Sequence, residues 1–130
     1  MSDRSDVLEA NASFYRAFQT KSLEAMDHIW AEEEVSCVHP GWPALESRAS
    51  ILDSYKMISS HAEQEPVLCL NPRLVLRGDH ALVLCEEQVG VSLLVASNLF
   101  LRAPKGWRLL HHQASPLMQA RPNVEAGRLN

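Results

Sequence analysis

The side chain best placed for chemistry in this sequence is His39. It ends a short β-prone segment, residues 35–39, and Pro40-Gly41 turns the chain directly after it. A titratable group at a strand end can face a ligand while a rigid backbone holds it. An unperturbed imidazole has a pKa near ~6.5, so His39 is suited to accept a proton near neutral pH. The alternative is that His39 only hydrogen-bonds the turn that follows it.

Asn98 and Glu87 are polar residues in strand-like, apolar surroundings. Because side chains alternate along a strand, Asn98 shares a face with Ala96 and Phe100. A buried amide needs hydrogen-bond partners, and the Asn98 NH2 group can donate to a ligand oxygen, to Glu87 or to backbone. Glu87 shares the face of Cys85, where burial would raise its carboxyl pKa and make it a proton donor. An exposed surface position for Glu87 is the alternative.

His111 and His112 are adjacent in a strand-like segment, so their side chains point to opposite faces and cannot both bind one metal ion. We favour His112 as the inward residue, because Leu110 and Ala114 flank it on the same face. A metal site that includes His39 has no support from ligand spacing, so no metal and no cofactor is expected.

Three aromatic residues complete the candidate pocket lining: Tyr15, Trp30 and Trp42. Aromatic residues at helical spacing are more often core than ligand contacts. Trp42 lies in a Pro-Gly-Trp-Pro turn, and could close the mouth of a pocket. The sequence has three cysteines, Cys37, Cys69 and Cys85. Their odd number does not suit a set of disulfides, and their spacing does not suit a metal site. We therefore expect free, buried cysteines in a reducing compartment.

The elements that must position these residues follow from periodicity. Three segments have helical spacing and a capping residue: 4–20, with Ser5 or Asp6 as the cap; Ser22 to Trp30; and 46–62, with Ser47 or Ser50 as the cap. Strand-like segments follow at 67–70, 73–76, 81–85, 91–102 and 107–116. Helices first and strands afterwards predict an α+β fold, with helices packed on one face of an antiparallel sheet.

Length and charge limit the possible functions. The 130 residues suit one domain, taken as 1–118, and the residues 119–130 that follow are expected to form a flexible tail. A net charge of −4 argues against a nucleic-acid partner, which needs a basic face. The sequence has no apolar run long enough for a membrane helix and no apolar leader segment. We therefore expect a cytoplasmic protein, neither embedded in a membrane nor secreted.

The order of these elements and four motifs together resemble a known family. The motifs are His39-Pro40-Gly41-Trp42, Gly78-Asp79-His80-Ala81, Ser97-Asn98-Leu99-Phe100 and the run 106–116. Over residues 5–117 the chain resembles the SnoaL-like branch of the nuclear transport factor 2 superfamily. The resemblance implies a cone-shaped, curved sheet wrapped around the helices, a pocket at the open end, and a homodimer formed through the sheet. The superfamily includes ketosteroid isomerases, polyketide cyclases, dehydratases and kinase association domains, so fold alone does not fix function.

The resemblance to the isomerases also implies roles for residues. Their general-base aspartate precedes a proline at the matching strand end, where this chain has His39. Asn98 matches the position of their protonated aspartic acid, and their tyrosine falls at Phe14 or Tyr15. His39 would therefore remove a C–H proton, while Asn98 and Tyr15 would stabilise the enolate oxygen. Trp30, Trp42, Glu87 and His112 would contact the ligand.

Three functions remain open at this point. The first is a cofactor-independent enzyme that transfers protons on a small, apolar carbonyl compound. The second is a protein that binds such a ligand without turnover, and the third is an assembly module that acts through its dimer surface. The enzyme hypothesis requires His39 and Asn98 to meet in one solvent-poor hollow.

Overall fold

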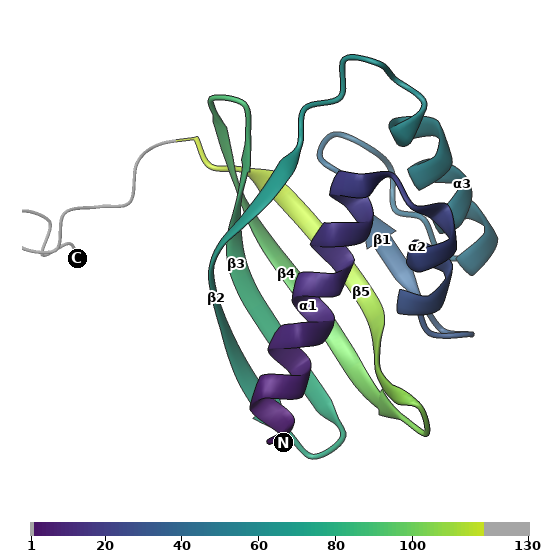
Figure 1. Ribbon diagram of the computed structural model, residues 1–130, viewed down its shortest axis with the longest axis vertical. Helices are drawn as coiled ribbons and strands as arrows, with labels where there is room; N and C mark the ends of the chain where they lie inside the picture. Colours follow the sequence, from purple (N-terminus) through teal and green to yellow (C-terminus); the bar gives the residue numbers. More distant parts are fainter. Residues whose placement is uncertain (1, 119–130) are drawn as a thin grey trace, which may run out of the picture.

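The computed structural model describes residues 2–118, so the expected tail lies outside the described residues. Three helices and five strands follow one another as α1 (Asp3–Thr20), α2 (Leu23–Ile29), β1 (Ser36–Val38), α3 (Arg48–Ser59), β2 (Val67–Arg77), β3 (His80–Val89), β4 (Ser92–Ala103) and β5 (Gly106–Pro116). Figure 1 shows α1 lying across a curved, unclosed sheet, with α2 and α3 beside it. This is the expected α+β fold with one domain.

Each helix begins at a serine whose side chain accepts a backbone N–H of the first turn. The caps are Ser2 for α1, Ser22 for α2 and Ser47 for α3. Ser22 and Ser47 were predicted. The prediction of Ser5 or Asp6 for α1 is wrong, because Ser2 accepts the N–H of Ser5 and the helix begins at Asp3.

The sheet order is β1-β5-β4-β3-β2. Strands β2 to β5 form an antiparallel meander, whereas β1 pairs in parallel with β5, so the sheet is not wholly antiparallel. The two segments predicted at 67–70 and 73–76 form one strand, β2, interrupted by a bulge in which Asn71 has a φ of 53°. The turn between β2 and β3 is the predicted one, with Gly78 in the left-handed region.

A second bulge lies in β5 and decides which histidine faces the core. Leu99 pairs with His111 but Phe100 pairs with Leu109, so the extra residue Leu110 shifts the alternation. His112 is buried as expected. Leu110 does not share its face, contrary to the prediction, because the bulge separates the two registers.

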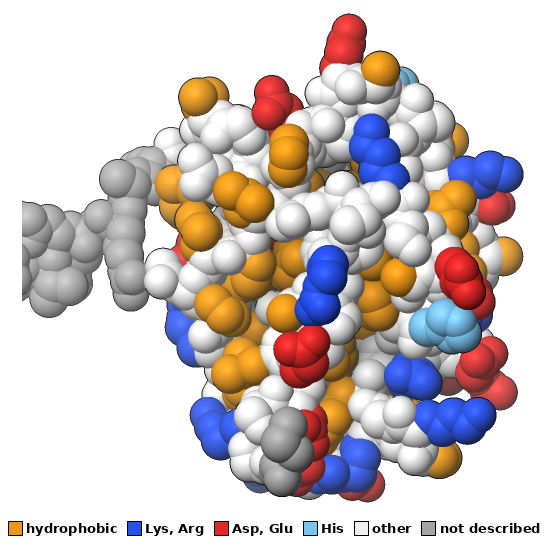
Figure 2. Space-filling model, in the orientation of Figure 1, with side chains coloured by type: hydrophobic (Ala, Val, Ile, Leu, Met, Phe, Trp, Pro, Cys, Tyr) orange, Lys and Arg blue, Asp and Glu red, His pale blue; other side chains and the backbone are white. Residues whose placement is uncertain are grey.

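The core lies between α1 and the inner face of the sheet. On β4 the residues Leu94, Ala96, Asn98 and Phe100 are all buried, which confirms the predicted alternation. Apolar side chains are visible on both flanks of α1 in Figure 2, whereas charged side chains project from the helix itself. No helix within residues 2–118 combines the length and apolar character needed to cross a membrane.

Candidate active site

A cavity of about 410 Å³ lies at the end of the sheet where β3 turns into β4 and β5 ends. Its walls are mostly apolar and include Phe18, Trp42, Ile58, Val67, Val89 and Leu94. Three titratable side chains also line it: His39, Glu87 and His112. Within the described part of the chain no arginine or lysine contributes to this lining. The cavity is therefore an apolar space with a few polar groups, the usual design of a small-molecule site.

His39 follows β1 and is held by α3. Its Nε2 lies 2.8 Å from the Ser54 hydroxyl, which donates its own proton to the Ile51 carbonyl oxygen at 2.6 Å. Since that hydroxyl has only one proton, the His39 Nε2–H must donate to it, and Nδ1 keeps the lone pair. Burial lowers the pKa of His39 to about 4, so the ring is neutral at pH 7 with Nδ1 as the basic atom.

Asn98 lies deeper, in the middle of β4, and is fully buried. Its NH2 group donates to Asn11 Oδ1 at 2.9 Å and to the Tyr15 hydroxyl at 3.1 Å. Its Oδ1 lies 2.5 Å from His112 Nδ1. Because an amide oxygen only accepts, His112 Nδ1 carries the proton and Nε2 has the lone pair.

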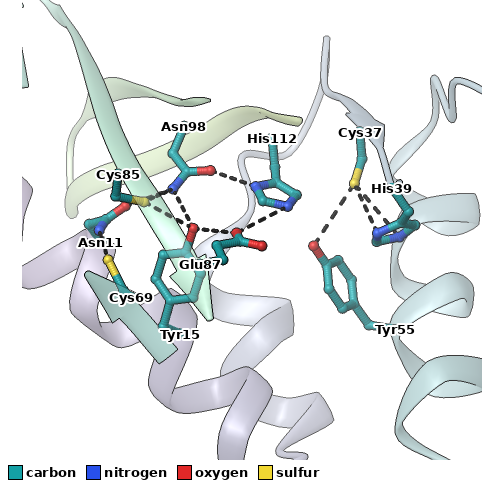
Figure 3. Close-up of polar contacts among 10 residues, drawn as sticks. All are labelled: Asn11, Tyr15, Cys37, His39, Tyr55, Cys69, Cys85, Glu87, Asn98 and His112. Carbon is teal, nitrogen blue, oxygen red and sulfur yellow. Dashed lines mark hydrogen bonds and ion pairs between the residues drawn. The ribbon is translucent and has the colours of Figure 1, made fainter. Parts of the chain in front are cut away.

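The hydrogen bonds of Asn98 continue through Tyr15 to Glu87, and together they form one buried network (Figure 3). The Tyr15 hydroxyl donates to Glu87 Oε2 at 2.6 Å. Burial raises the pKa of Tyr15, so its proton stays in place. Burial also raises the pKa of Glu87, against the opposing effect of the Tyr15 hydrogen bond, and so favours the protonated carboxyl group.

Glu87 and His112 face each other with 3.9 Å between Oε2 and Nε2. Burial lowers the pKa of His112 to about 3, while it raises that of Glu87. The two directions agree: burial keeps the His112 imidazole neutral and favours a proton on the Glu87 carboxyl group. A neutral imidazole thus lies beside a carboxyl group whose burial favours its protonated form.

The structure brings together four of the residues predicted for the site. His39, Trp42, Glu87 and His112 line the cavity, and Trp42 packs edge-on against His39 with ring centroids 5.0 Å apart. Asn98 does not line it, and no hydrogen bond within residues 2–118 joins it to His39; in Figure 3, His112 and Glu87 lie between them. The direct meeting that we expected is therefore corrected.

Tyr15 and Trp30 also lie behind the cavity lining. Tyr15 is buried, and its hydroxyl is occupied by Glu87 and Asn98, whereas Phe14 packs as core. Trp30 is 1% exposed and packs near Phe14 and Tyr55, so it is core and does not contact the cavity. Neither side chain therefore belongs to the cavity lining.

Sequence reasoning missed two residues of the site, Ser54 and Asn11. Asn11 is a polar residue within the apolar stripe of α1, 1% exposed, and that pattern was visible in the sequence. Ser54 lies on the buried face of α3 next to Tyr55, and only the fold shows that it contacts His39.

Two other kinds of site are less well supported. Residues 2–118 contain no cluster of three or more potential metal ligands. A larger groove of about 890 Å³ lies between α1, α2 and the β4–β5 turn. Its charged groups are surface residues such as Arg102, which pairs with Asp3, and it contains none of the buried titratable groups.

The comparisons with known proteins agree with this architecture. The family model of the SnoaL-like domain matches residues 7–119. The chain belongs to the SnoaL-like family. A comparison with curated proteins gives no match.

Solved structures place this SnoaL-like chain among nuclear-transport-factor-2-like proteins. A protein of that family from Streptomyces avermitilis, provisionally assigned as a dehydratase, is 34% identical over 90% of this chain and 97% of its own, with a TM-score of 0.82. A protein from Thiobacillus denitrificans, provisionally assigned as a calcium/calmodulin-dependent protein kinase type II association domain, is 27% identical over 84% and 93%, with a TM-score of 0.76. A nuclear-transport-factor-2-like protein with a cystatin-like fold from Novosphingobium aromaticivorans shares the fold at 18% identity, covering 98% of this chain and 89% of its own, with a TM-score of 0.72.

Proposed function

We propose that this SnoaL-like protein is a cofactor-independent enzyme that moves protons on a small, neutral carbonyl compound, and that dehydration of a β-hydroxy carbonyl compound is the reaction it suits best. The observation that carries the proposal is the lining of one apolar cavity by a neutral imidazole, His39, and by Glu87, whose buried carboxyl group favours the protonated form. A base and an acid in one water-poor space are the minimum for such an elimination. The provisional dehydratase assignment of the 34% identical relative supports the same reaction class.

The roles follow from the hydrogen-bond directions. His39 Nδ1, the nitrogen with the lone pair, takes the proton α to the carbonyl group. The Glu87 carboxyl group gives its proton to the β-hydroxyl group, which leaves as water while the new C=C bond forms. His39 then carries an extra proton and Glu87 is ionised, and proton exchange through water restores both. Asn98 and Tyr15 act behind the cavity by holding His112 and Glu87 in place.

The cavity also favours a particular class of ligand. Because the described lining has no arginine or lysine, a carboxylate or phosphate group would be buried there without a counter-ion, which is costly. A volume of about 410 Å³ at protein-like packing holds roughly 15 to 20 non-hydrogen atoms. We therefore expect a neutral, mostly apolar hydroxy ketone or aldehyde of that size.

The decisive experiment is turnover of a panel of neutral β-hydroxy ketones by wild type, Glu87→Gln and His39→Gln. Each substitution is expected to lower kcat by about 10²- to 10⁴-fold while ligand affinity changes little, because general acid and base groups contribute that much. Glu86→Gln is the matched control, since Glu86 lies on the opposite face of β3 and pairs with Arg73. Unchanged kcat in both variants would refute the assignment, and binding without turnover by wild type would favour the ligand-binding function instead.

We also infer that the protein is a homodimer that buries the outer face of its sheet. Four apolar residues on that face are 39–60% exposed: Leu68, Val75, Leu93 and Val95. Large apolar side chains exposed on one face of a sheet are typical of interaction sites. The similarity to a kinase association domain is compatible with self-assembly.

A further inference from the structure

Asn11 is a buried polar residue that does not line the cavity. It lies on the inner face of α1 at 1% exposure. Its Oδ1 accepts from Asn98 Nδ2 at 2.9 Å, and its own NH2 group donates to Cys69 Sγ at 3.5 Å. A buried amide is costly unless its partners are fixed, and these two contacts fix both ends of the Asn11 side chain.

The Asn11 oxygen in turn favours one of the two possible orientations of the Asn98 amide, in the same sense as the Tyr15 hydroxyl, which also accepts from Asn98 Nδ2. With the NH2 group toward Asn11 Oδ1, the Asn98 oxygen faces His112 Nδ1. If the Asn98 amide were reversed, two carbonyl oxygens would face each other across 2.9 Å without a proton between them. Asn11 therefore disfavours that reversal, through direct contact and with no group of its own in the cavity.

The orientation of Asn98 then decides which nitrogen of His112 is protonated. An oxygen at Nδ1 requires Nδ1–H, which leaves the lone pair on Nε2, the atom 3.9 Å from Glu87 Oε2. In the opposite tautomer, Nε2–H would point toward Glu87 Oε2, and the cavity would lose this imidazole acceptor. With Nδ1 protonated, His112 Nε2 can accept a hydrogen bond from a ligand hydroxyl that also accepts one from the Glu87 carboxyl group.

We propose that Asn11 is a positioning residue that fixes, through Asn98, the Nδ1–H tautomer of His112, so that the cavity presents a hydrogen-bond acceptor beside the Glu87 donor. The use of this donor–acceptor pair in catalysis rests on the proposed function. The tautomer itself does not, because it is set in the ligand-free protein.

The test is nitrogen NMR of the imidazoles in the ligand-free protein, with His112 assigned by comparison with His112→Gln. Wild type is expected to show His112 protonated on Nδ1. Asn11→Leu is expected to mix the two tautomers, and to lower kcat on a neutral hydroxy ketone about 10- to 100-fold with a small change in KM, because a wrong tautomer removes a correctly placed lone pair. Asn11→Asp keeps an acceptor oxygen toward Asn98 and is expected to restore the wild-type tautomer.

Val7→Ala is the matched control, since Val7 is buried on the same helix and its side chain has no hydrogen-bonding group, so its truncation perturbs the core but removes no hydrogen bond of this network. A His112 that carries its proton on Nε2 in wild type overturns the proposal, and so does an unchanged tautomer in Asn11→Leu. If Asn11→Leu fails to fold, the wild-type and Asn11→Asp spectra still decide. Absence of turnover with the expected tautomer would refute only the proposed enzyme activity.

Discussion

Burial has the same consequence for each titratable side chain in the cavity: it favours the uncharged form. It lowers the pKa of His39 to about 4 and that of His112 to about 3, and it raises the pKa of Glu87. An imidazole of low pKa is a weak base, but it is fully deprotonated and available at neutral pH. Both imidazoles are therefore neutral near pH 7, and the raised pKa of Glu87 favours a proton on its carboxyl group.

His39 should make the folded state sensitive to acid. Its pKa is about 6.5 when unfolded and about 4 when folded, so the unfolded chain binds more protons between these values and stability falls as pH falls. Between pH 7 and pH 4.5 the His39 contribution to this loss is on the order of 2 kcal/mol. The free energy of unfolding of His39→Gln is expected to fall by about that much less than that of wild type between the two pH values, as measured by urea unfolding.

The control for this experiment is His61→Gln, because His61 is exposed. It should keep the acid sensitivity of wild type. Equal losses of stability in wild type and His39→Gln would show that His39 is not buried in its neutral form.

At the level of secondary structure, sequence patterns predicted the features that depend on neighbouring residues, namely helix bounds, helix caps and the alternation of side chains along strands. Helical spacing and the caps Ser22 and Ser47 gave two helices with nearly correct bounds, and alternation placed Glu87 and Asn98 on the inner face. The β5 bulge was missed because an extra residue such as Leu110 has no distinctive sequence signal.

The other wrong predictions concern which strands pair and how deeply a side chain is buried, because both depend on tertiary contacts. The parallel pairing of β1 with β5 joins residues 75 positions apart, so no local pattern could indicate it. Asn98 was correctly placed on its face but not in the cavity, because the packing of α1 decides how much of that face a ligand can reach. Ser54 was missed for the same reason, since its contact with His39 exists only in the folded chain.

The α3 helix carries Ser54, so its stability bears on the site. Ser47 accepts the backbone N–H of Ser50 at 3.1 Å and thereby caps α3. Ser47→Ala is expected to lower the free energy of unfolding by about 1 kcal/mol, as measured by urea denaturation. Ser60→Ala, at the other end of the helix, should change it by less than about 0.5 kcal/mol, since a substitution there removes no N-cap. Equal effects at both ends would contradict the capping role of Ser47.

At the scale of the whole molecule, the outer face of the sheet is the surface through which we propose that the protein dimerises. Val75 and Val95 are 60% and 39% exposed on this face. If the face forms the dimer, the double variant Val75→Glu/Val95→Glu should be monomeric in light scattering after gel filtration while wild type is dimeric, because two buried, unpaired carboxylates would oppose association.

Met57→Glu is the control for assembly, because Met57 is 55% exposed but lies on α3, away from the sheet face. It should leave the dimer intact. A wild-type monomer, or a double variant that remains dimeric, would exclude this face as the interface.

The parallel pairing of β1 with β5 has a consequence for the order in which the protein acquires its site. Glu87 and His112 belong to the meander β2–β5, whose hairpins close over short stretches of chain. His39 joins them only when a loop of some 75 residues has closed, from Ser36 to His111. Closing a long loop is slower and entropically costlier than zipping a hairpin. We therefore expect a refolding chain to bring Glu87 and His112 together early and to add His39 last, so that any activity of this site should appear only at the end of folding.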